Sequence, residues 1–351
     1  MFKNKVANKA TNKAMKKAAI ATLASLGVLA VSATITAQDD YVPPMTDYGV
    51  PDLQGVWRNA TVTPLTRPEE LGTQRAYTRE EAAMLERAAQ QAVEDDNEPL
   101  DPDRPPPPAE DLPPVGNYDL FWTDRGMFMP TIDGEYRTSI IIDPPNGQMP
   151  DYTDEFLARR AEERANGPGP FDGPEGRGLG ERCLLSFGSN SGPPMLPVMY
   201  NSHYQIVQSP GYVAINVEMV HDTRIILIQD EHDPHAGVMN KWMGDSIGRW
   251  EGNTLVVETR HFHPQQSFRG ASENLTVIEK FRRSEDDKII YTFTVNDPTT
   301  FESSFTGELP LSSYDEPLYE YACHEGNYAL AGTLAGARRA EREEAEQQDS
   351  N

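Results

Sequence analysis

The sequence predicts a mainly β protein, an antiparallel barrel or sandwich with two N-terminal helices. Three observations support this fold class. From Tyr204 onward, apolar and polar residues alternate with a period of two, as they do in half-buried strands. Short turn sequences, such as Ser-Pro-Gly at 209–211 and Ser-Glu-Asp-Asp at 284–287, separate these strands closely enough for antiparallel hairpins. Before Tyr204, two stretches show the periodicity of amphipathic helices.

The first 37 residues have the three parts of a secretory signal peptide. Six lysines precede an apolar run over 18–31, and small-residue cleavage sites end at Ala33 and Ala37. A retained anchor is the alternative, because the apolar run approaches the ~20 residues that span a bilayer. The polar residues after Ala37 favour cleavage. We therefore expect a periplasmic or secreted protein that has no membrane contact once the signal peptide is removed.

The composition argues against nucleic acid as a partner. The chain has 55 acidic and 31 basic residues and a net charge of -24 at pH 7. Removal of the signal peptide takes away six of the lysines and makes the charge more negative. Such a surface repels nucleic acid and anionic lipid, which proteins bind through Lys and Arg contacts to phosphate. The remaining length suits a single β-rich domain over 38–338, followed by a charged, disordered tail over 339–351.

The first predicted elements are a strand, a helix and a linker. Gly55-Val-Trp57 marks the first strand, and its Gly-x-Trp resembles the opening of lipocalin-type barrels, whose tryptophan plugs the closed end. An ordinary core tryptophan is the alternative. The capping box Thr78-Arg-Glu-Glu81 opens a helix that ends near Glu94. Residues 98–115 form a proline-rich, acidic linker of extended conformation.

The middle of the chain predicts a buried strand over 137–143, a turn, and a charged helix over 151–166. A glycine-rich loop follows over 167–180. The later strands are predicted at 204–208, 212–221, 224–229, 254–263, 275–282, 288–295 and 318–324. Between them, residues 242–253 combine two tryptophans with turn residues at Gly248 and 251–253. We interpret that segment as the rim of a pocket.

Cys183 and Cys323 are the only two cysteines, and we expect them to form a disulfide in an oxidising compartment. Closing so long a loop contributes on the order of 4 kcal/mol in the chain-entropy model. Two buried free thiols are the alternative. Neither cysteine belongs to a C-x-x-C pattern, so redox catalysis is not expected.

Histidines and carboxylates near strand ends are the candidates for acid/base catalysis. Strand parity places His221 at the end of the apolar face of its strand, at the mouth of the barrel. His324 ends the last predicted strand, where Glu320 or Glu325 could orient its imidazole as a general base. Asp245 is the candidate orienting carboxylate on the pocket rim. Hydrogen-bonded structural corners are the alternative for both histidines.

Aromatic and arginine side chains are the candidates for substrate binding. Flat faces suited to a sugar ring or an aromatic ligand come from Trp122, Trp242, Trp250 and Tyr328. Arg224 is the candidate clamp for a carboxylate. Core packing is the alternative for any single aromatic residue.

A metal site is a weaker hypothesis. His261-Phe-His263 places two imidazoles on one strand face, a spacing that zinc and iron accept, with His221 or His235 as a third ligand. The sequence identifies no supporting carboxylate. It also contains no Walker loop, dinucleotide fingerprint or serine nucleophile elbow. We therefore expect no metal and no other cofactor.

Four motifs resemble a widespread family of exported bacterial proteins that are usually described as hypothetical. They are Arg137-Thr-Ser with Ile-Asp-Pro-Pro at 142–145, Glu181-Arg-Cys183, GDSIGRWEGNTLVV at 244–257, and YEYACHEGNY at 319–328. The resemblance extends from about Gly55 to Arg338. It implies export and one domain, and it implies no reaction because the family has no settled activity. Around His261 the family pattern more often reads Asn-Phe, which argues against a family-wide role for this histidine.

These observations predict an exported β-barrel-like protein that acts as a cofactor-free acid/base enzyme, an isomerase, lyase or hydrolase, on a small organic or sugar-like substrate. The first alternative is a lipocalin-like protein that binds a small molecule without catalysis, and the second is a His-x-His metalloenzyme. Pocket polarity separates the first two classes. Histidine and carboxylate groups that converge within hydrogen-bond reach favour the enzyme, and a deep apolar bore favours the carrier.

Overall fold

The computed structural model describes residues 41–96, 123–124, 126–187, 191–233, 239–266 and 268–349, all of which belong to one unit, Asp39–Asn351. The predicted signal peptide lies outside these residues, as do Trp122, His235 and the whole of the predicted proline-rich linker. Among the helices of the described residues, none has the length and apolar composition needed to span a bilayer.

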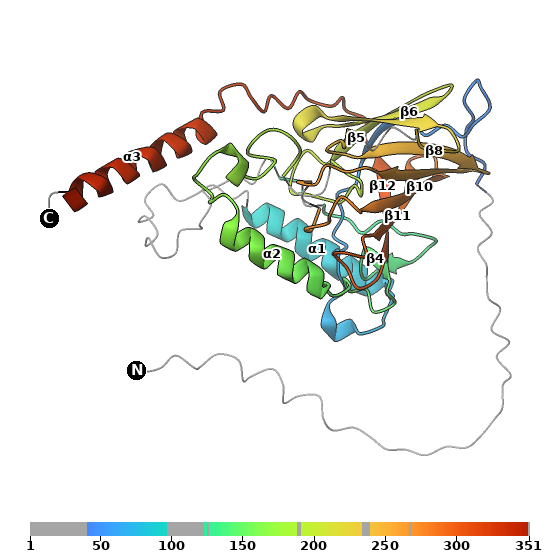
Figure 1. Ribbon diagram of the computed structural model, residues 1–351. Helices are drawn as coiled ribbons and strands as arrows, with labels where there is room; N and C mark the ends of the chain where they lie inside the picture. Colours follow the sequence, from blue (N-terminus) through green and yellow to red (C-terminus); the bar gives the residue numbers. More distant parts are fainter. Residues whose placement is uncertain are drawn as a thin grey trace, which may run out of the picture. The chain divides into compact units, whose positions relative to one another are not determined.

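Nine strands of the described chain close into a barrel (Figure 1). In order around the barrel they are β1 (Gly55–Arg58), β5 (His203–Ser209), β6 (Tyr212–Val217), β7 (Thr223–Ile228), β8 (Asp245–Glu251), β9 (Thr254–Arg260), β10 (Thr276–Glu285), β11 (Lys288–Asn296) and β12 (Phe305–Ser313). The barrel closes at β1, which pairs with β5 on one side and with β12 on the other. The closing register places Trp57 opposite Ser313. The predicted mainly β class is therefore confirmed as a barrel.

The predicted hairpin turns lie where the strands require them. Tight turns join β5 to β6, β8 to β9 and β10 to β11, and Gly211 and Gly252 supply the positive φ angles of 92° and 59° in the first two. The prediction of a turn at Gly248 is wrong, because this residue lies inside β8. A Cβ at Gly248 would come within 2.9 Å of Ile226 Cγ2, so its glycine permits close strand packing.

Not every neighbouring pair of strands is antiparallel. β8 runs parallel to β7, with Leu227 opposite Ile247, because the connection over 229–244 returns the chain to the starting end of β7. Two predicted strand boundaries also differ from the structure. β6 ends at Val217, and the chain then forms a 3-10 turn (Met219–His221) in which Val220 has a φ of 64°. Residues 318–324 form no strand, and β12 lies earlier in the chain instead.

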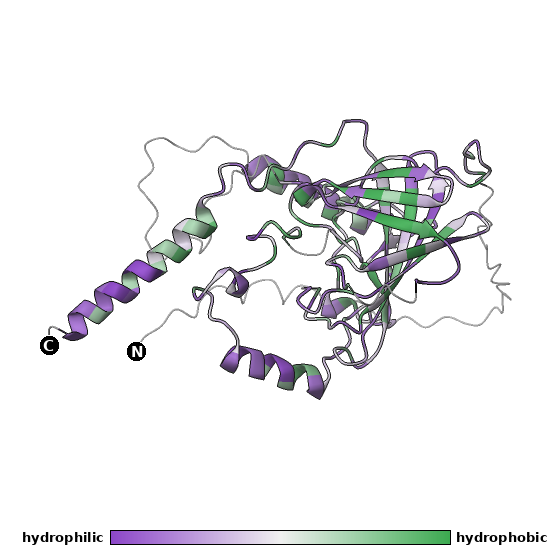
Figure 2. Ribbon diagram, turned by 45° about the horizontal axis from the view of Figure 1, so that its top comes forward, coloured by the Kyte–Doolittle hydropathy of each residue, from purple (hydrophilic) through white to green (hydrophobic). Residues whose placement is uncertain are grey.

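Three helices occur among the described residues: α1 (Arg79–Asp96), α2 (Asp154–Asn166) and α3 (Ala329–Asp349). The capping box at α1 is formed, since the Glu81 carboxylate accepts the Thr78 backbone N–H at 2.8 Å. Both α1 and α2 follow β1 in the chain, so they are inserted between strands and do not precede the barrel. Residues 339–349, predicted to be disordered, form the second half of α3, whose hydrophilic end is visible in Figure 2.

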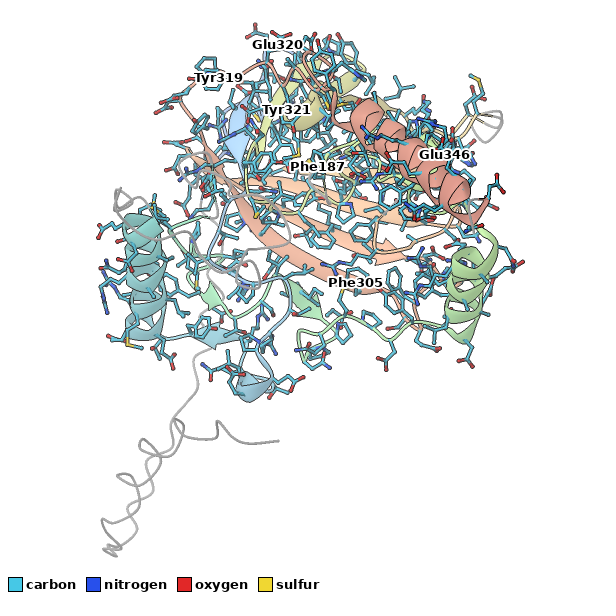
Figure 3. The ribbon with its side chains drawn as sticks, turned by 90° about the vertical axis from the view of Figure 1, so that its left-hand side faces the viewer. Phe187, Phe305, Tyr319, Glu320, Tyr321 and Glu346 are labelled. Carbon is cyan, nitrogen blue, oxygen red and sulfur yellow. A yellow bond between two sulfur atoms is a disulfide. The ribbon has the colours of Figure 1, made fainter. Side chains whose placement is uncertain are left out.

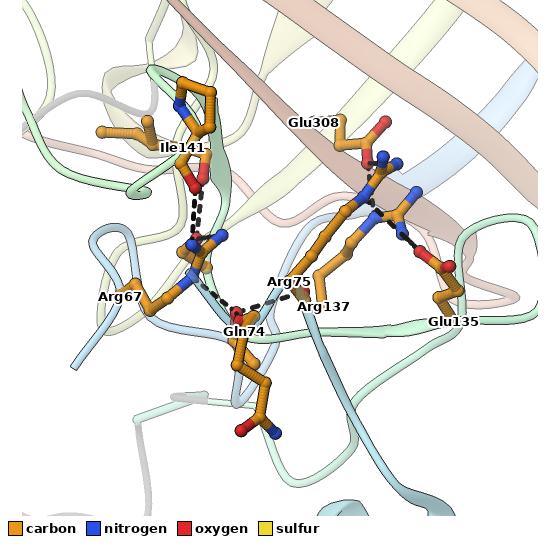
Figure 4. Close-up of polar contacts among 10 residues, drawn as sticks. Arg67, Gln74, Arg75, Glu135, Arg137, Ile141 and Glu308 are labelled. Carbon is orange, nitrogen blue, oxygen red and sulfur yellow. Dashed lines mark hydrogen bonds and ion pairs between the residues drawn. The ribbon is translucent and has the colours of Figure 1, made fainter. Parts of the chain in front are cut away.

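Small pieces of sheet and a group of arginines attach the inserted segments to the barrel. β4 (Ile141–Asp143) pairs with β12, and β2 (Ala76–Tyr77) pairs with β3 (Tyr136–Arg137). Figure 4 shows the Arg137 guanidinium between Glu135 and Glu308, with its Nε 2.5 Å from a Glu308 oxygen.

Arg67 lies beside this group and is buried against neutral partners, including the Thr138 hydroxyl at 2.8 Å and the Pro145 carbonyl at 2.7 Å. Burial lowers the pKa of Arg67, and the neighbouring charge of Arg75 lowers it further. Arg67 is thus held by hydrogen bonds to uncharged acceptors. These bonds join the loop of Arg67 to the segment around Thr138.

The barrel interior is filled by side chains. Alternate residues of the strands point inward, and they include Trp57, Tyr204, Phe281, Tyr291, Phe293 and Phe305, each at most 2% exposed. A charged pair lies among them. Arg224 Nη2 is 2.5 Å from Glu279 Oε2, and the two side chains are 1% and 0% exposed. The Tyr291 hydroxyl donates to the other Glu279 oxygen at 2.8 Å.

Arg224, the predicted clamp for a carboxylate, is thus buried in the lumen and paired with Glu279. Its Nη2 also lies 3.5 Å from the hydroxyl oxygens of Ser246 and Thr259. Burial by itself would lower the pKa of Arg224, but Glu279 outweighs that effect and raises it. The guanidinium therefore stays charged and tied to its neighbours across the lumen.

Replacing Glu279 with alanine should strongly destabilise the barrel, because it leaves the Arg224 charge buried without a partner. We expect the free energy of unfolding, measured by urea denaturation, to fall by about 3–5 kcal/mol. The double variant Arg224→Met/Glu279→Leu should recover most of this loss. The exposed pair of Arg339 and Glu343 on α3 is the control, and Glu343→Ala should cost less than about 0.5 kcal/mol. A small effect of Glu279→Ala would contradict the role assigned to the pair.

Candidate functional site

A cleft of 520 Å³ opens outside the barrel, between the glycine-rich loop and the C-terminal segment. We call it the disulfide cleft. Its volume lies within the range of small-ligand sites, roughly 300–1,000 Å³. It is lined by Arg177, Gly180, Glu181, Phe187, Asn201, Glu320, Tyr321, Ala322, Cys323, Asn327, Ala329, Leu330 and Thr333.

The disulfide between Cys183 and Cys323 holds the two walls of the cleft together. The predicted bond is present, with the two Cα atoms 5.8 Å apart. Asn327 Nδ2 lies 3.6 Å from the Cys183 sulfur and adds a weak contact across the same junction. Figure 2 shows the apolar first half of α3, which contributes Leu330 to the wall. Segments distant in the sequence therefore meet at one covalent link.

The charged groups of the cleft are unequally paired. Arg177 is bonded to Glu181 and donates from Nη1 to the Pro170 carbonyl at 3.2 Å. The hydrogen bond from Arg177 lowers the pKa of Glu181 and outweighs the opposite effect of burial. Glu320, by contrast, has no hydrogen-bond or ion-pair partner among the residues that the structure describes. The cleft thus carries one uncompensated carboxylate.

A histidine and a buried carboxylate lie directly behind the wall of this cleft. His203 Nδ1 is 2.5 Å from Glu218 Oε2, and the side chains are 12% and 3% exposed. The other Glu218 oxygen accepts the Tyr319 backbone N–H at 3.2 Å, and the Asn201 side chain also bonds to Glu218. Asn201 lines the cleft, and Tyr319 immediately precedes Glu320. Glu218 therefore binds two segments of the cleft wall, one through the Asn201 side chain and the other through the Tyr319 backbone.

The environment of this pair keeps the carboxylate ionised. Burial raises the pKa of Glu218, but the hydrogen bond and charge of His203, together with the bonds from Tyr319 and Asn201, lower it below its usual value. The His203 Nε2 atom is buried and has no hydrogen-bond partner among the described residues. The ring packs against Tyr314, with centroids 4.2 Å apart. An imidazole oriented in this way by a carboxylate is the arrangement of a general base.

Hairpin register explains the pairing, which the sequence analysis missed. Tyr204 on β5 lies opposite Val217 on β6, so His203 and Glu218 occupy the next opposed positions. The turn at Pro210-Gly211 fixes this register. Counting outward from that turn would have placed the two residues opposite each other.

The sequence-predicted catalytic residues are not members of this pair, although the His221 backbone N–H donates to the Glu218 carbonyl at 3.2 Å. Glu320 lines the disulfide cleft, as the hypothesis of a pocket residue requires, but His221, His324 and Glu325 do not. His221 has a φ of 51° at the end of the 3-10 turn and is exposed, so it does not continue the apolar face of β6. His324 lies in a bend after the disulfide, and it shares no strand face with Glu320 because no strand forms there.

Asp245 and the two rim tryptophans belong to a different cluster. Asp245 accepts from Lys241 Nζ at 2.7 Å and lies 3.2 Å from His232 Nδ1. These two partners lower the pKa of Asp245, although burial alone would raise it. Trp242 stacks on His263 with centroids 3.9 Å apart, and Trp250 packs against the barrel core. None of these residues lines the disulfide cleft.

The His-x-His pair does not adopt the geometry on which the metal hypothesis depends. β9 ends at Arg260, and His261 has a φ of 58°, so His261 and His263 do not share a strand face. His263 Nδ1 accepts the Gln265 backbone N–H at 3.1 Å. In the described ranges, no group of three His, Cys, Asp or Glu side chains is arranged to hold a metal ion.

The remaining predicted binding residue, Tyr328, is 81% exposed just before α3 and does not line the cleft. Comparison of the chain with protein-family models, with curated proteins and with solved structures finds no match.

Removal of the disulfide should release the C-terminal wall of the cleft. In the variant Cys183→Ser/Cys323→Ser, we expect faster cleavage by chymotrypsin between β12 and α3, because this tyrosine-containing segment is mostly exposed and then lacks its covalent tether. Mass spectrometry of the fragments locates the cuts. The barrel fragment should stay resistant in both proteins, and equal resistance of the segment in the two would contradict this role.

The hydrogen bond from Tyr319 to Glu218 should depend on pH. The pKa of Glu218 is lower in the folded protein than its ordinary value of 4.5. The stabilisation that the ionised carboxylate gives to the fold is therefore fully present above pH 4.5, and it is lost as the pH falls through the pKa of the folded state. Amide hydrogen exchange measures this directly, after correction for intrinsic rates. Protection of Tyr319 should fall in acid and be weak at all pH values in Glu218→Gln. The Cys323 amide, bonded to the Tyr321 carbonyl, is the control, and similar behaviour of both amides would refute the assignment.

Proposed function

We propose that this protein is an exported acid/base enzyme in which His203 is the general base, Glu218 orients it, and the disulfide cleft admits the substrate. One observation carries the proposal. The imidazole is fixed at Nδ1 by an ionised, buried carboxylate, while Nε2 has no partner among the described residues. A histidine and a carboxylate that meet within hydrogen-bond distance favour an enzyme over a carrier.

The pair can accept and return one proton. In neutral His203, Nδ1–H donates a hydrogen bond to Glu218, which leaves the lone pair on Nε2. Nε2 can then remove a proton from a substrate C–H or O–H group, or from a water molecule, and the adjacent carboxylate stabilises the imidazolium that forms. Glu320 supplies a second carboxylate from the cleft wall. Isomerisation, elimination and hydrolysis of a small organic or sugar-like molecule all use such steps without a cofactor.

Access to Nε2 requires movement of the segment between β12 and α3. Tyr314 packs over the His203 ring, and Tyr319 is bonded to Glu218, so this segment lies over the pair. Most of its side chains are exposed, and the Cys183–Cys323 disulfide tethers it near α3. In this proposal, the segment moves when substrate enters from the cleft.

Several features support export to the periplasm or the medium. The first 37 residues have the pattern of a signal peptide, and the Cys183–Cys323 disulfide persists best in an oxidising compartment. The motifs at 244–257 and 319–328 support membership of the family of exported bacterial proteins that they resemble. We include export and this membership in the proposal.

A lipocalin-like carrier receives less support. The closed barrel and the Gly-x-Trp of β1 agree with such a fold, and Trp57 Nε1 donates to the Leu53 carbonyl at 2.9 Å. A carrier of that type, however, holds its ligand in the lumen. Here the Arg224–Glu279 pair and aromatic rings occupy the inward-facing positions. A ligand is therefore better accommodated in the cleft outside the barrel.

The test compares His203→Asn with the wild-type protein and with His324→Asn. Each purified protein is incubated with a defined mixture of small metabolites, esters and glycosides, and mass spectrometry follows the loss of each compound. We expect His203→Asn to lose about 100-fold or more in the rate of any turnover found. His324→Asn should retain the rate. Loss in His324→Asn alone, or equal rates in wild type and His203→Asn, would refute the assignment of the base.

A further inference from the structure

We propose that the disulfide cleft binds an organic ammonium ion through Glu320, Phe187 and Tyr321. This inference names a substrate class for the proposed enzyme, and it rests on that proposal only in taking the cleft as the substrate site. The binding itself is argued from the walls of the cleft.

The charge of the cleft favours a cation. Three of its lining residues are charged, and the Arg177 guanidinium is neutralised by Glu181. Glu320 remains, with no ion-pair partner among the residues described. The whole chain carries a net charge of -24, which attracts cations toward the surface and repels anions. A neutral ligand would leave the Glu320 charge uncompensated.

Two aromatic rings stand in the same cleft as this carboxylate. Phe187 is 44% exposed, so its ring is open to a ligand, and Tyr321 lines the cleft beside Glu320. Figure 3 labels Glu320, Tyr321 and Phe187 in one view of this side of the protein. Carboxylates and aromatic faces together recognise ammonium groups, because both present negative potential to the cation.

Glycine at position 180 allows the Phe187 ring to lie against the loop. A Cβ built on Gly180 would come within 2.6 Å of Phe187 Cδ1, so any larger residue would displace the ring. The position of Phe187 in the cleft is therefore built into the glycine-rich loop. Phe187 therefore occupies a defined position against Gly180, whereas a phenylalanine exposed by chance would require no glycine beside it.

The other lining residues favour an alkylated ammonium over a bare metal ion. Ala322, Ala329 and Leu330 supply apolar surface that suits methyl and methylene groups. A divalent cation would need several oxygen ligands, and the described chain offers no group of three acidic or histidine side chains so arranged. We therefore assign the cleft to a ligand that joins a positive nitrogen to small apolar substituents.

Calorimetric titration with choline tests the assignment, and 3,3-dimethylbutan-1-ol serves as its uncharged isostere. We expect wild type to bind choline, with affinity falling as salt rises, and to bind the isostere at least about tenfold more weakly. Glu320→Gln and Phe187→Ala should each weaken choline binding by about tenfold. Glu316→Gln is the matched control, since Glu316 belongs to the same segment, is exposed and does not line the cleft.

The outcomes separate this inference from the proposed enzyme. Absence of choline binding, equal binding of the isostere, or unchanged binding in Glu320→Gln overturns the ammonium site. If binding follows these expectations while His203→Asn keeps full turnover, the cleft assignment stands and the assignment of the base fails.

Discussion

The ion pair between Arg224 and Glu279 is the interaction around which the barrel is assembled. Arg224 comes from β7, Glu279 from β10, and the polar groups that approach them come from β8, β9 and β11. Five consecutive strands thus contribute to one buried network, which is satisfied only when each strand has its correct register. The pair also occupies the lumen, so the barrel acts as a scaffold. The proposed ligand binding and chemistry are therefore assigned to segments outside it.

The candidate site is assembled from those outer segments and from one edge of the scaffold. The β5–β6 hairpin places His203 opposite Glu218, and Glu218 in turn holds the backbone of Tyr319. The disulfide anchors the same C-terminal segment a few residues later. A rigid support therefore carries the histidine and its carboxylate, while a mostly exposed segment, tethered by the disulfide, forms one wall of the cleft. This division is common in enzymes, whose catalytic groups need fixed positions and whose substrates need a way in.

The sequence predicted the features that depend on local periodicity and turn chemistry. Alternating residues identified most barrel strands, and Gly252 marked a real hairpin turn. It misassigned residues whose role depends on a distant neighbour. Gly248 looks like a turn residue, but it is a glycine because Ile226 of the adjacent strand leaves no room for a Cβ.

Residues 318–324 alternate as a strand does and still form none, because no neighbouring strand pairs with them. The His203–Glu218 pair was missed because it depends on the register between two strands. The disulfide was predicted from the number of cysteines and the expected compartment, but these gave no indication of the cleft beside it.

The seam between β1 and β12 has a consequence for biogenesis. β1 lies near the start of the described chain and β12 near its end, and only two residue pairs join them. A ribosome delivers β1 before the other eight strands of the barrel, whereas β12 emerges after all of them. Until then, one edge of β1 and the indole of Trp57 have no final partner, and exposed strand edges promote aggregation. The nascent chain would therefore benefit from a chaperone that protects this edge until β12 has been made.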